Sequence, residues 1–241
     1  VNASISTVIF LRDDVYDWLL AEASDRGKDS TVRVQWREPE LLRQLVERRL
    51  EVASADLKID PPIRWSNVAQ GDIKGEPLFE YLVRHCLRRP RSLLDLIELS
   101  LSNAALAGRA AISAEDAERA VAAYSSDMLR DLNYEIRDVF PEADKIIYGF
   151  AKENFRLDQR NVERSANRQL KDVNRSTRFV RMMLWFGFFG VIGGDGSENY
   201  IFDHGDDIEL LLSHAGKSQN PILCIHPLFR GALSLRTDLL F

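Results

Sequence analysis

The sequence predicts a mainly α-helical protein that begins with a short remnant of an α/β domain and ends in a winged helix-turn-helix. Three observations support this prediction. A β-branched apolar run opens the chain, amphipathic helical patterns fill its middle, and three short helical patterns followed by a glycine-rich turn close it. The corresponding parts are expected at residues 1–37, 38–140 and 141–241.

The composition is that of a soluble protein with a packed core. The 241 residues are 45% hydrophobic and 29% charged, and the net charge of −5 is too small for wholesale disorder. The longest apolar stretch, residues 182–194, is shorter than the roughly 20 residues that cross a bilayer, so no membrane partner is expected. Cys86 and Cys224 lack a CxxC partner or metal-ligand spacing, which indicates buried thiols and a cytoplasmic location.

The start of the chain has the strand–helix–strand order of an α/β domain. Thr7 to Leu11 (TVIFL) is typical of a buried parallel strand, Asp13 to Ala23 has helical spacing, and Val32 to Trp36 alternates apolar and polar residues. The first residue is Val, and we expect the chain to begin inside a longer protein whose other strands complete this sheet. Without them, the two strands should pair with another polypeptide or be poorly packed.

The middle of the chain predicts a helical bundle. Helices are expected from a Pro39 start through Val52, from Leu78 to Leu87, from Pro90 to Ala107, and from a Ser113 cap to Arg137. Residues 53–77 contain prolines and glycines and are expected to form a long irregular connection.

The last hundred residues predict a winged helix-turn-helix. Helices are expected at Ala143 to Phe150, Val162 to Leu170 and Ser176 to Phe186. A hairpin of Phe188 to Ile192 and Tyr200 to Phe202 should follow, with its turn at residues 193–196. Residues 221–230 (PILCIHPLFR) are expected to pack back on this unit as a closing apolar element.

The order of these parts resembles the C-terminal part of bacterial P-loop ATPases of the AAA+/STAND class. The resemblance rests on VIFLRDD, TVRVQW, RRPRSLLDLI, ISAEDAERAVAAYS and HPLFRGAL, taken in this order, and it covers essentially the whole chain. It implies an ATP-binding core with Mg²⁺ upstream of Val1, which would be the principal partner of this segment. ATP and Mg²⁺ would therefore be held by that missing N-terminal core, not by this segment alone.

The phosphate-binding loop itself is absent from the sequence. A P-loop needs GxxxxGK[ST] after a strand, whereas Gly216-Lys217-Ser218 has Leu211 five residues earlier and follows a helical pattern. The segment alone is therefore expected not to hydrolyse ATP, because phosphoryl transfer depends on that loop and on Mg²⁺.

The resemblance also implies nucleotide-sensing arginines. Arg12 ends the first expected strand, and Arg91 follows Pro90 at the start of a lid helix, with Arg88 and Arg89 as alternates. Arginine presents a fork of donors that suits phosphate, and a helix N-terminus favours an anion. The alternatives are an ion pair of Arg12 with a nearby aspartate, and a solvated basic turn around Arg91.

A basic series in the terminal unit indicates possible contact with nucleic acid. Eight basic side chains against three acids give residues 156–181 a local charge of +5. Arginines four residues apart share a helical face and could neutralise phosphates, although a solvated face or a protein-binding surface would have the same pattern. The candidate residues are Arg156, Arg160, Arg164, Arg168, Lys171, Arg175 and Arg178.

The histidines indicate no catalytic site. His85, His204, His214 and His226 show no HxxxH or triad pattern, and His226 before Pro227 is expected to be a core or capping residue. The sequence thus favours a lid and winged-helix segment that senses nucleotide state and couples it to a partner, to nucleic acid or to another copy of itself. The alternative is a non-enzymatic DNA-binding or protein-interaction regulator.

Overall fold

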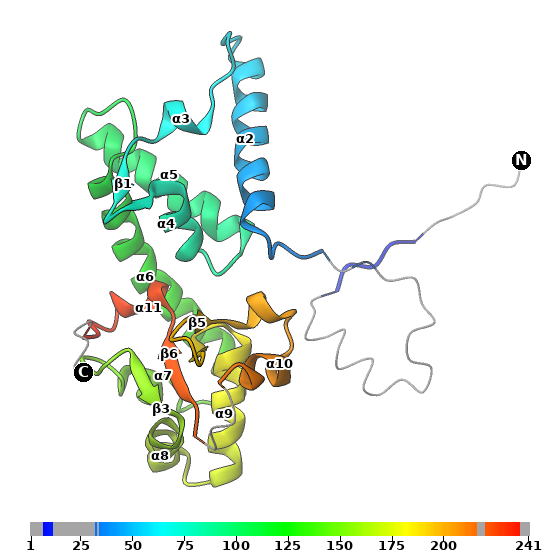
Figure 1. The fold of residues 1–241 in the computed structure, drawn as a ribbon, viewed down its shortest axis with the longest axis vertical. Helices are drawn as coiled ribbons and strands as arrows, with labels where there is room; N and C mark the ends of the chain where they lie inside the picture. The colour runs from blue at the N-terminus through cyan, green and yellow to red at the C-terminus, as the bar shows by residue number, and fades with distance from the viewer. Residues whose placement is uncertain (1–6, 12–31, 33, 216–219, 237–241) are drawn as a thin grey trace, which may run out of the picture. The chain divides into compact units, whose positions relative to one another are not determined.

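The computed structural model describes residues 7–11, 32, 34–215 and 220–236, and its contacts divide the chain into two units, Val1–Gln35 and Trp36–Phe241. The mainly α-helical fold class is confirmed (Figure 1). None of the described helices combines the length and the apolar character that crossing a bilayer would require.

The expected strands at the start of the chain are not formed in the described residues. Thr7 to Leu11 have no strand pairing, and Val8, Ile9 and Phe10 are 74%, 75% and 92% exposed. Residues 34–36 have no strand pairing either. A strand needs a neighbour for its backbone N–H and C=O groups, and these described residues have none, so they are poorly packed. The expected helix at 13–23 lies outside the described residues.

The helical bundle forms largely as its apolar spacing requires. Ser113 caps α6 and shares a reciprocal capping box with Asp116, and a proline in the first turn starts both α2 and α5. The expected irregular connection contains a short helix and a two-residue hairpin. The elements are α2 (Pro39–Asp56), α3 (Trp65–Val68), β1 (Asp72–Ile73), β2 (Glu76–Pro77), α4 (Leu78–Arg84), α5 (Pro90–Leu106) and α6 (Ala114–Ile136).

The C-terminal part, residues 141–241, which we call the winged part, contains helices at the three expected places and a sheet. Its four strands are antiparallel in the order β3-β6-β4-β5. The elements are α7 (Ala143–Tyr148), β3 (Arg156–Asp158), α8 (Gln159–Leu170), α9 (Val173–Trp185), β4 (Phe189–Ile192), β5 (Glu198–Asn199), η1 (Ile201–His204), α10 (Ile208–Ser213), β6 (Ile222–Ile225) and α11 (Pro227–Arg230).

One expectation about the sheet is wrong, and another is incomplete. The hairpin turn is where the glycines predict it, but the second strand is Glu198–Asn199, because the backbone at Tyr200 turns into the 3₁₀ helix η1. The segment PILCIHPLFR packs back on the winged part as expected, but it does so as a central strand of the sheet. It supplies β6, whose Cys224 pairs with Arg156 of β3 on one side and Gly190 of β4 on the other.

One core runs through the bundle and the winged part. The long helix α6 packs against α5 and also contacts α7 and α11 (Figure 1). Ser125 of α6 donates a hydrogen bond to the backbone oxygen of Leu228 and accepts one from the amide of Ala232. At the expected boundary after residue 140, Phe140 is buried edge-on against Phe179 of α9, with ring centroids 5.4 Å apart. The two parts are therefore joined by packing and not by a linker.

Candidate functional site

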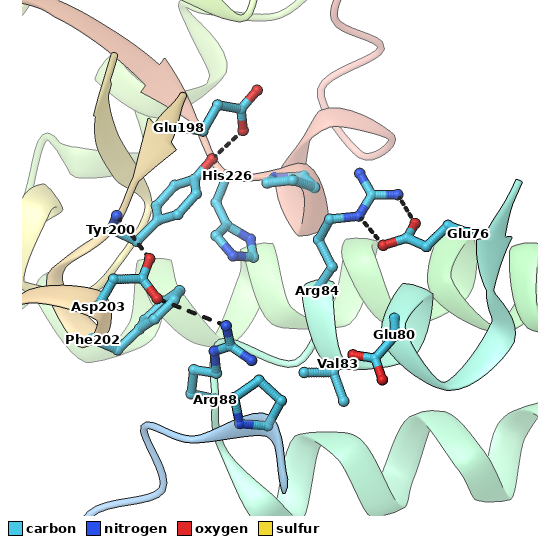
Figure 2. A pocket seen from close by; sticks show the side chains of 12 residues that line it. Glu76, Glu80, Val83, Arg84, Arg88, Glu198, Tyr200, Phe202, Asp203 and His226 are labelled. Carbon is cyan, nitrogen blue, oxygen red and sulfur yellow. Dashed lines mark hydrogen bonds and ion pairs between the residues drawn. The ribbon is translucent and has the colours of Figure 1, made fainter. Parts of the chain in front are cut away.

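A pocket of about 300 Å³ lies where the bundle meets the winged part (Figure 2). One wall comes from β2, α4 and the turn after α4, and the other from β5, η1 and the β6–α11 junction. Such a volume is at the lower end of the range for small-ligand sites. The lining residues are Pro39, Glu76, Glu80, Val83, Arg84, Arg88, Glu198, Tyr200, Phe202, Asp203, His226 and Pro227.

Arg84 and the two acids near it form ion pairs on the α4 wall. The guanidinium of Arg84 binds Glu76 through two hydrogen bonds, Nε to Oε1 at 3.1 Å and Nη2 to Oε2 at 2.5 Å. Glu80 accepts a hydrogen bond of 2.8 Å from Arg43 of α2. Both carboxylates of this wall are therefore neutralised by arginine.

The turn between α4 and α5 directs Arg88 into the pocket. Leu87 and Arg88 both have positive φ, 53° and 54°, a conformation that is costly for residues other than glycine. Leu87 is buried, and its Cδ2 lies 3.4 Å from where a Cβ on Gly187 would be. Packing therefore maintains the strained turn and places the Arg88 guanidinium 3.7 Å from Asp203, over the Phe202 ring. At that distance the ion pair is not a close hydrogen bond.

Tyr200 and Glu198 form the opposite wall. The Tyr200 hydroxyl donates to Glu198 at 2.7 Å, and Arg230 donates to the same carboxylate at 2.5 Å. Burial raises the pKa of Tyr200 well above its usual value of 10.0, so the phenol keeps its proton. The ring stacks on Phe202, with centroids 5.6 Å apart.

The two ring nitrogens of His226 have different surroundings: Nδ1 bonds to the backbone, and Nε2 faces the pocket. The side chain is 2% exposed, and Nδ1 accepts a hydrogen bond of 3.1 Å from the amide of Leu228, which caps α11. Burial lowers the pKa of His226 well below 6.5, so the ring is neutral near pH 7 and Nε2 carries the hydrogen. Figure 2 shows the ring pointing into the pocket, and no described residue accepts a hydrogen bond from Nε2. The expectation of a core or capping role for His226 is confirmed.

The pocket thus presents N–H donors from two separate parts of the fold. Arg88 comes from the bundle, and His226 comes from the winged part. Its four carboxylates are each paired with an arginine, so an anionic oxygen would find donors here without unpaired negative charge opposite them. No metal-ligating cluster occurs in the described part of the chain, which includes Asp203, Asp206 and Asp207.

Of the expected sensor arginines, Arg89 and Arg91 lie outside the pocket. Arg12 is outside the described residues. Arg89 is the residue before α5 and lines a narrow hollow against α6 and Phe229, and Arg91 is exposed in the first turn of α5. Neither lines the larger pocket, whereas the alternate Arg88 does. Residues 216–218, the GKS sequence that lacks the rest of a P-loop motif, also lie outside the described residues.

The basic series divides among three elements. Arg160, Arg164 and Arg168 share the exposed face of α8, as expected. Arg156 belongs instead to β3, where it is half-buried and its Nε has no hydrogen-bond partner. Arg156 therefore does not share the helical face of the three α8 arginines, because β3 ends before α8 begins.

The remaining basic residues follow that turn. Lys171 ends α8 in a left-handed conformation, with φ of 53°. Arg175 of α9 donates a hydrogen bond of 3.2 Å to Glu142, and Arg178 is exposed. Arg181, further along α9, pairs with Glu209 of α10 at 2.6 Å.

Residues 40–133, which correspond to the helical bundle, match the family model FunZ_C, described as the FunZ-associated C-terminal helical domain. The winged part lies outside this match. No solved structure matches the chain.

Two curated relatives are similar to parts or all of the chain. The putative transposon gamma-delta 80.3 kDa protein of Escherichia coli K12 is 26% identical over 255 aligned residues, which cover 98% of this chain and 35% of that protein. Allergen Alt a 2 of Alternaria alternata is 29% identical over 145 residues, which cover 58% of this chain and 75% of the allergen. The chain spans about a third of the length of the E. coli relative.

Proposed function

We propose that this chain is the lid and winged-helix portion of a P-loop ATPase, and that it senses the nucleotide held by a core in the longer protein. The observation that carries the proposal is the convergence of Arg88 and His226 on one pocket. A phosphate oxygen in this pocket would be bound by both the bundle and the winged part. Loss of the phosphate would therefore remove a contact that joins the two parts.

The sequence context supports the same proposal. The parts follow the order found in the AAA+/STAND class, and the aligned E. coli protein is long enough to hold a nucleotide-binding core beside the region similar to this chain. By itself the segment would not hydrolyse ATP, because it has no phosphate loop.

Unpaired buried thiols support a cytoplasmic location for the protein. Cys86 and Cys224 are both free and buried. Burial raises the pKa of Cys86 to about 11 and that of Cys224 to about 12, so both stay as unreactive thiols. Buried thiols that form no disulfide are typical of reducing compartments.

The test uses the longer protein and a pair of substitutions at one position. His226→Asn keeps an acceptor near Nδ1 for the α11 cap and removes the pocket donor, whereas His226→Gln keeps a donor near Nε2 and removes the cap. His226→Asn and Arg88→Gln should each weaken ATP or ADP binding about tenfold, the value of one charge-assisted hydrogen bond. His226→Gln should bind nearly as the parent does.

Arg119→Gln, an exposed change on α6, is the matched control for Arg88→Gln. A loss in His226→Gln with normal binding in His226→Asn would assign the effect to the cap and not to a nucleotide contact. Normal binding in Arg88→Gln and His226→Asn would refute the pocket as a sensor. Arg12→Ala and Arg91→Ala in the same protein should cut ATP turnover if those arginines sense the γ-phosphate.

Nucleotide binding by the unsubstituted longer protein distinguishes the ATPase proposal from the alternative, a non-enzymatic regulator. A longer protein that binds no ATP with Mg²⁺ present would favour the regulator. The regulator would then act through another surface, such as the exposed arginines of α8.

A further inference from the structure

Helix α8 has two opposite faces of different chemistry. Val162, Ala166 and Leu170 are buried at four-residue intervals. The three arginines 160, 164 and 168 recur at the same interval, displaced by two residues. Because an α-helix turns about 100° per residue, this displacement places the arginines about 200° from the buried row. The helix is therefore fixed by one face and presents an arginine row on the other.

The arginine row carries uncompensated charge. Among the described residues, no carboxylate forms an ion pair with Arg160, Arg164 or Arg168, and Arg164 donates only to the neutral Asn161, at 3.2 Å. The nearby acids are engaged in local hydrogen bonds. Asp158 caps α8, Glu163 accepts a hydrogen bond of 2.9 Å from Gln159, and Asp172 caps α9.

The row extends past the end of α8. Lys171 follows directly and is exposed, and Arg178 is exposed on α9; no described residue pairs with either. We call these five cations, Arg160, Arg164, Arg168, Lys171 and Arg178, the α8 basic surface.

The spacing of the three arginines matches the spacing of phosphates along a nucleic-acid strand. Four residues of helix advance about 6 Å, so the three arginines span about 12 Å. One strand of B-DNA carries three to four phosphates over about that length of axis. Each arginine can therefore meet its own phosphate without the helix bending.

The surroundings of the row favour duplex nucleic acid over other anionic partners. The exposed side of α8 carries no large apolar residue, which a membrane-surface helix or a protein hot spot would need. No aromatic side chain of α8 or α9 is exposed, so the surface lacks the stacking platform that single strands use. Asn161 and Gln169, also exposed, add neutral donors suited to phosphate oxygens.

The neighbouring helix is poorly suited to read bases. Two of the arginines of α9 already face acids, Arg175 with Glu142 and Arg181 with Glu209 of α10. In its second half Val180, Met183 and Leu184 are buried. Base-specific contacts from α9 are thus restricted to its first turns, while the α8 row is open along its length.

We propose that the α8 basic surface binds the phosphate backbone of duplex DNA without sequence preference. This inference does not depend on the nucleotide-sensing proposal, because no residue of the surface lines the pocket. The overall charge of −5 makes such binding local to this surface and sensitive to salt.

The test measures binding of the full chain to a fluorescent duplex of about 20 base pairs, by anisotropy at salt concentrations from about 25 to about 200 mM. For five phosphate contacts, the logarithm of the association constant should fall with the logarithm of salt concentration with a slope of about −4.5. Replacing Arg160, Arg164 and Arg168 together by Gln should reduce the slope by about 2.7 and weaken binding at low salt by about tenfold or more.

The matched control removes the same charge from other surfaces. Arg48, Arg119 and Arg130 are exposed on α2 and α6, and their joint replacement by Gln should leave the slope unchanged. Arg164→Glu alone should weaken binding more than Arg164→Gln, with an unchanged circular dichroism spectrum. An unchanged slope in the α8 variant, an equal loss in the control, or tighter binding of a single strand than of the duplex would each overturn the proposal.

Discussion

Acidification from about pH 7.5 to about pH 5 should destabilise the unit of residues 36–241, because His85 and His226 are buried there as neutral rings. His85 is 6% exposed, and its Nδ1 lies 2.7 Å from the backbone oxygen of Tyr81, to which it donates. Burial, reinforced by the charges of Arg84 and Arg230, lowers the pKa of His85 from 6.5 to about 4. The lowered pKa of His226 has the same principal cause.

The sign and size follow from linkage. A histidine whose pKa is lower in the folded state stabilises the fold above its unfolded pKa, and this stability is lost as pH falls toward the folded pKa. With pKa values of about 6.5 unfolded and about 4 folded, His85 alone reduces the free energy of unfolding by about 2 kcal/mol between pH 7.5 and pH 5. His226 adds a loss in the same direction.

Urea unfolding followed by tryptophan fluorescence at three pH values in this window measures the effect. His85→Asn keeps a donor for the Tyr81 oxygen and cannot titrate, so its loss on acidification should be smaller than that of the parent by about 2 kcal/mol. If both proteins lose the same stability between these pH values, buried His85 is not the cause.

Three further substitutions test the packing, each by urea unfolding near neutral pH. In Gly190→Ala the new Cβ would lie 2.5 Å from the backbone oxygen of Asn199, so we expect the free energy of unfolding to fall by about 1 to 3 kcal/mol. In Gly194→Ala the new Cβ meets open space, so the free energy of unfolding should hardly change. Ser125→Ala leaves two backbone groups of the C-terminal segment without their partner and should cost about 1 to 3 kcal/mol. Arg109 holds the pKa of Asp116 well below its usual value of 3.8, so Asp116→Asn should be destabilising near neutral pH, and this penalty should shrink progressively as pH falls below about 4. A penalty of the same size at about pH 4 and at about pH 2 would contradict this.

Much of the helical architecture could be predicted because each helix carries its own signals. Pro39 and Pro90 start α2 and α5 where expected, and the Ser113 cap and the apolar spacing of α6 place that helix within a residue of its observed bounds. Such signals are local, since caps and periodicity act within a few residues.

The sheet could be predicted only in part, because strand pairing is not local. The glycine turn at 193–196 indicated the β4–β5 hairpin, but nothing near residue 222 indicates that β6 lies between β3 and β4. Its apolar run fits a buried strand and a closing element equally well. Pairing of Leu157 with Leu223 joins positions far apart in the chain, and only the fold brings them together.

The pocket was missed for the same reason. The sequence offers Arg88 only as an alternate sensor, and its pattern predicts a plain strand for Tyr200 to Phe202. The signal that singles out Arg88 is conformational. The two left-handed residues at 87 and 88 are held by packing on Gly187, which no local pattern around Arg88 reveals.

The segment between β4 and β6 connects the two proposals physically. Its residues Glu198 and Asp203 pair with Arg230 and Arg88 beside the pocket, and Glu209 pairs with Arg181, about one turn along α9 from Arg178 of the α8 basic surface. A ligand that draws Arg88 away from Asp203 would release one anchor of this segment and leave the Glu209–Arg181 ion pair to hold it alone, which favours a shift of the segment that breaks this pair. If the segment shifts, Arg181 is freed and the DNA affinity should rise when the pocket is occupied. Glu209→Gln should then mimic that rise without nucleotide, whereas equal DNA affinity in Glu209→Gln and the parent would leave the two surfaces uncoupled.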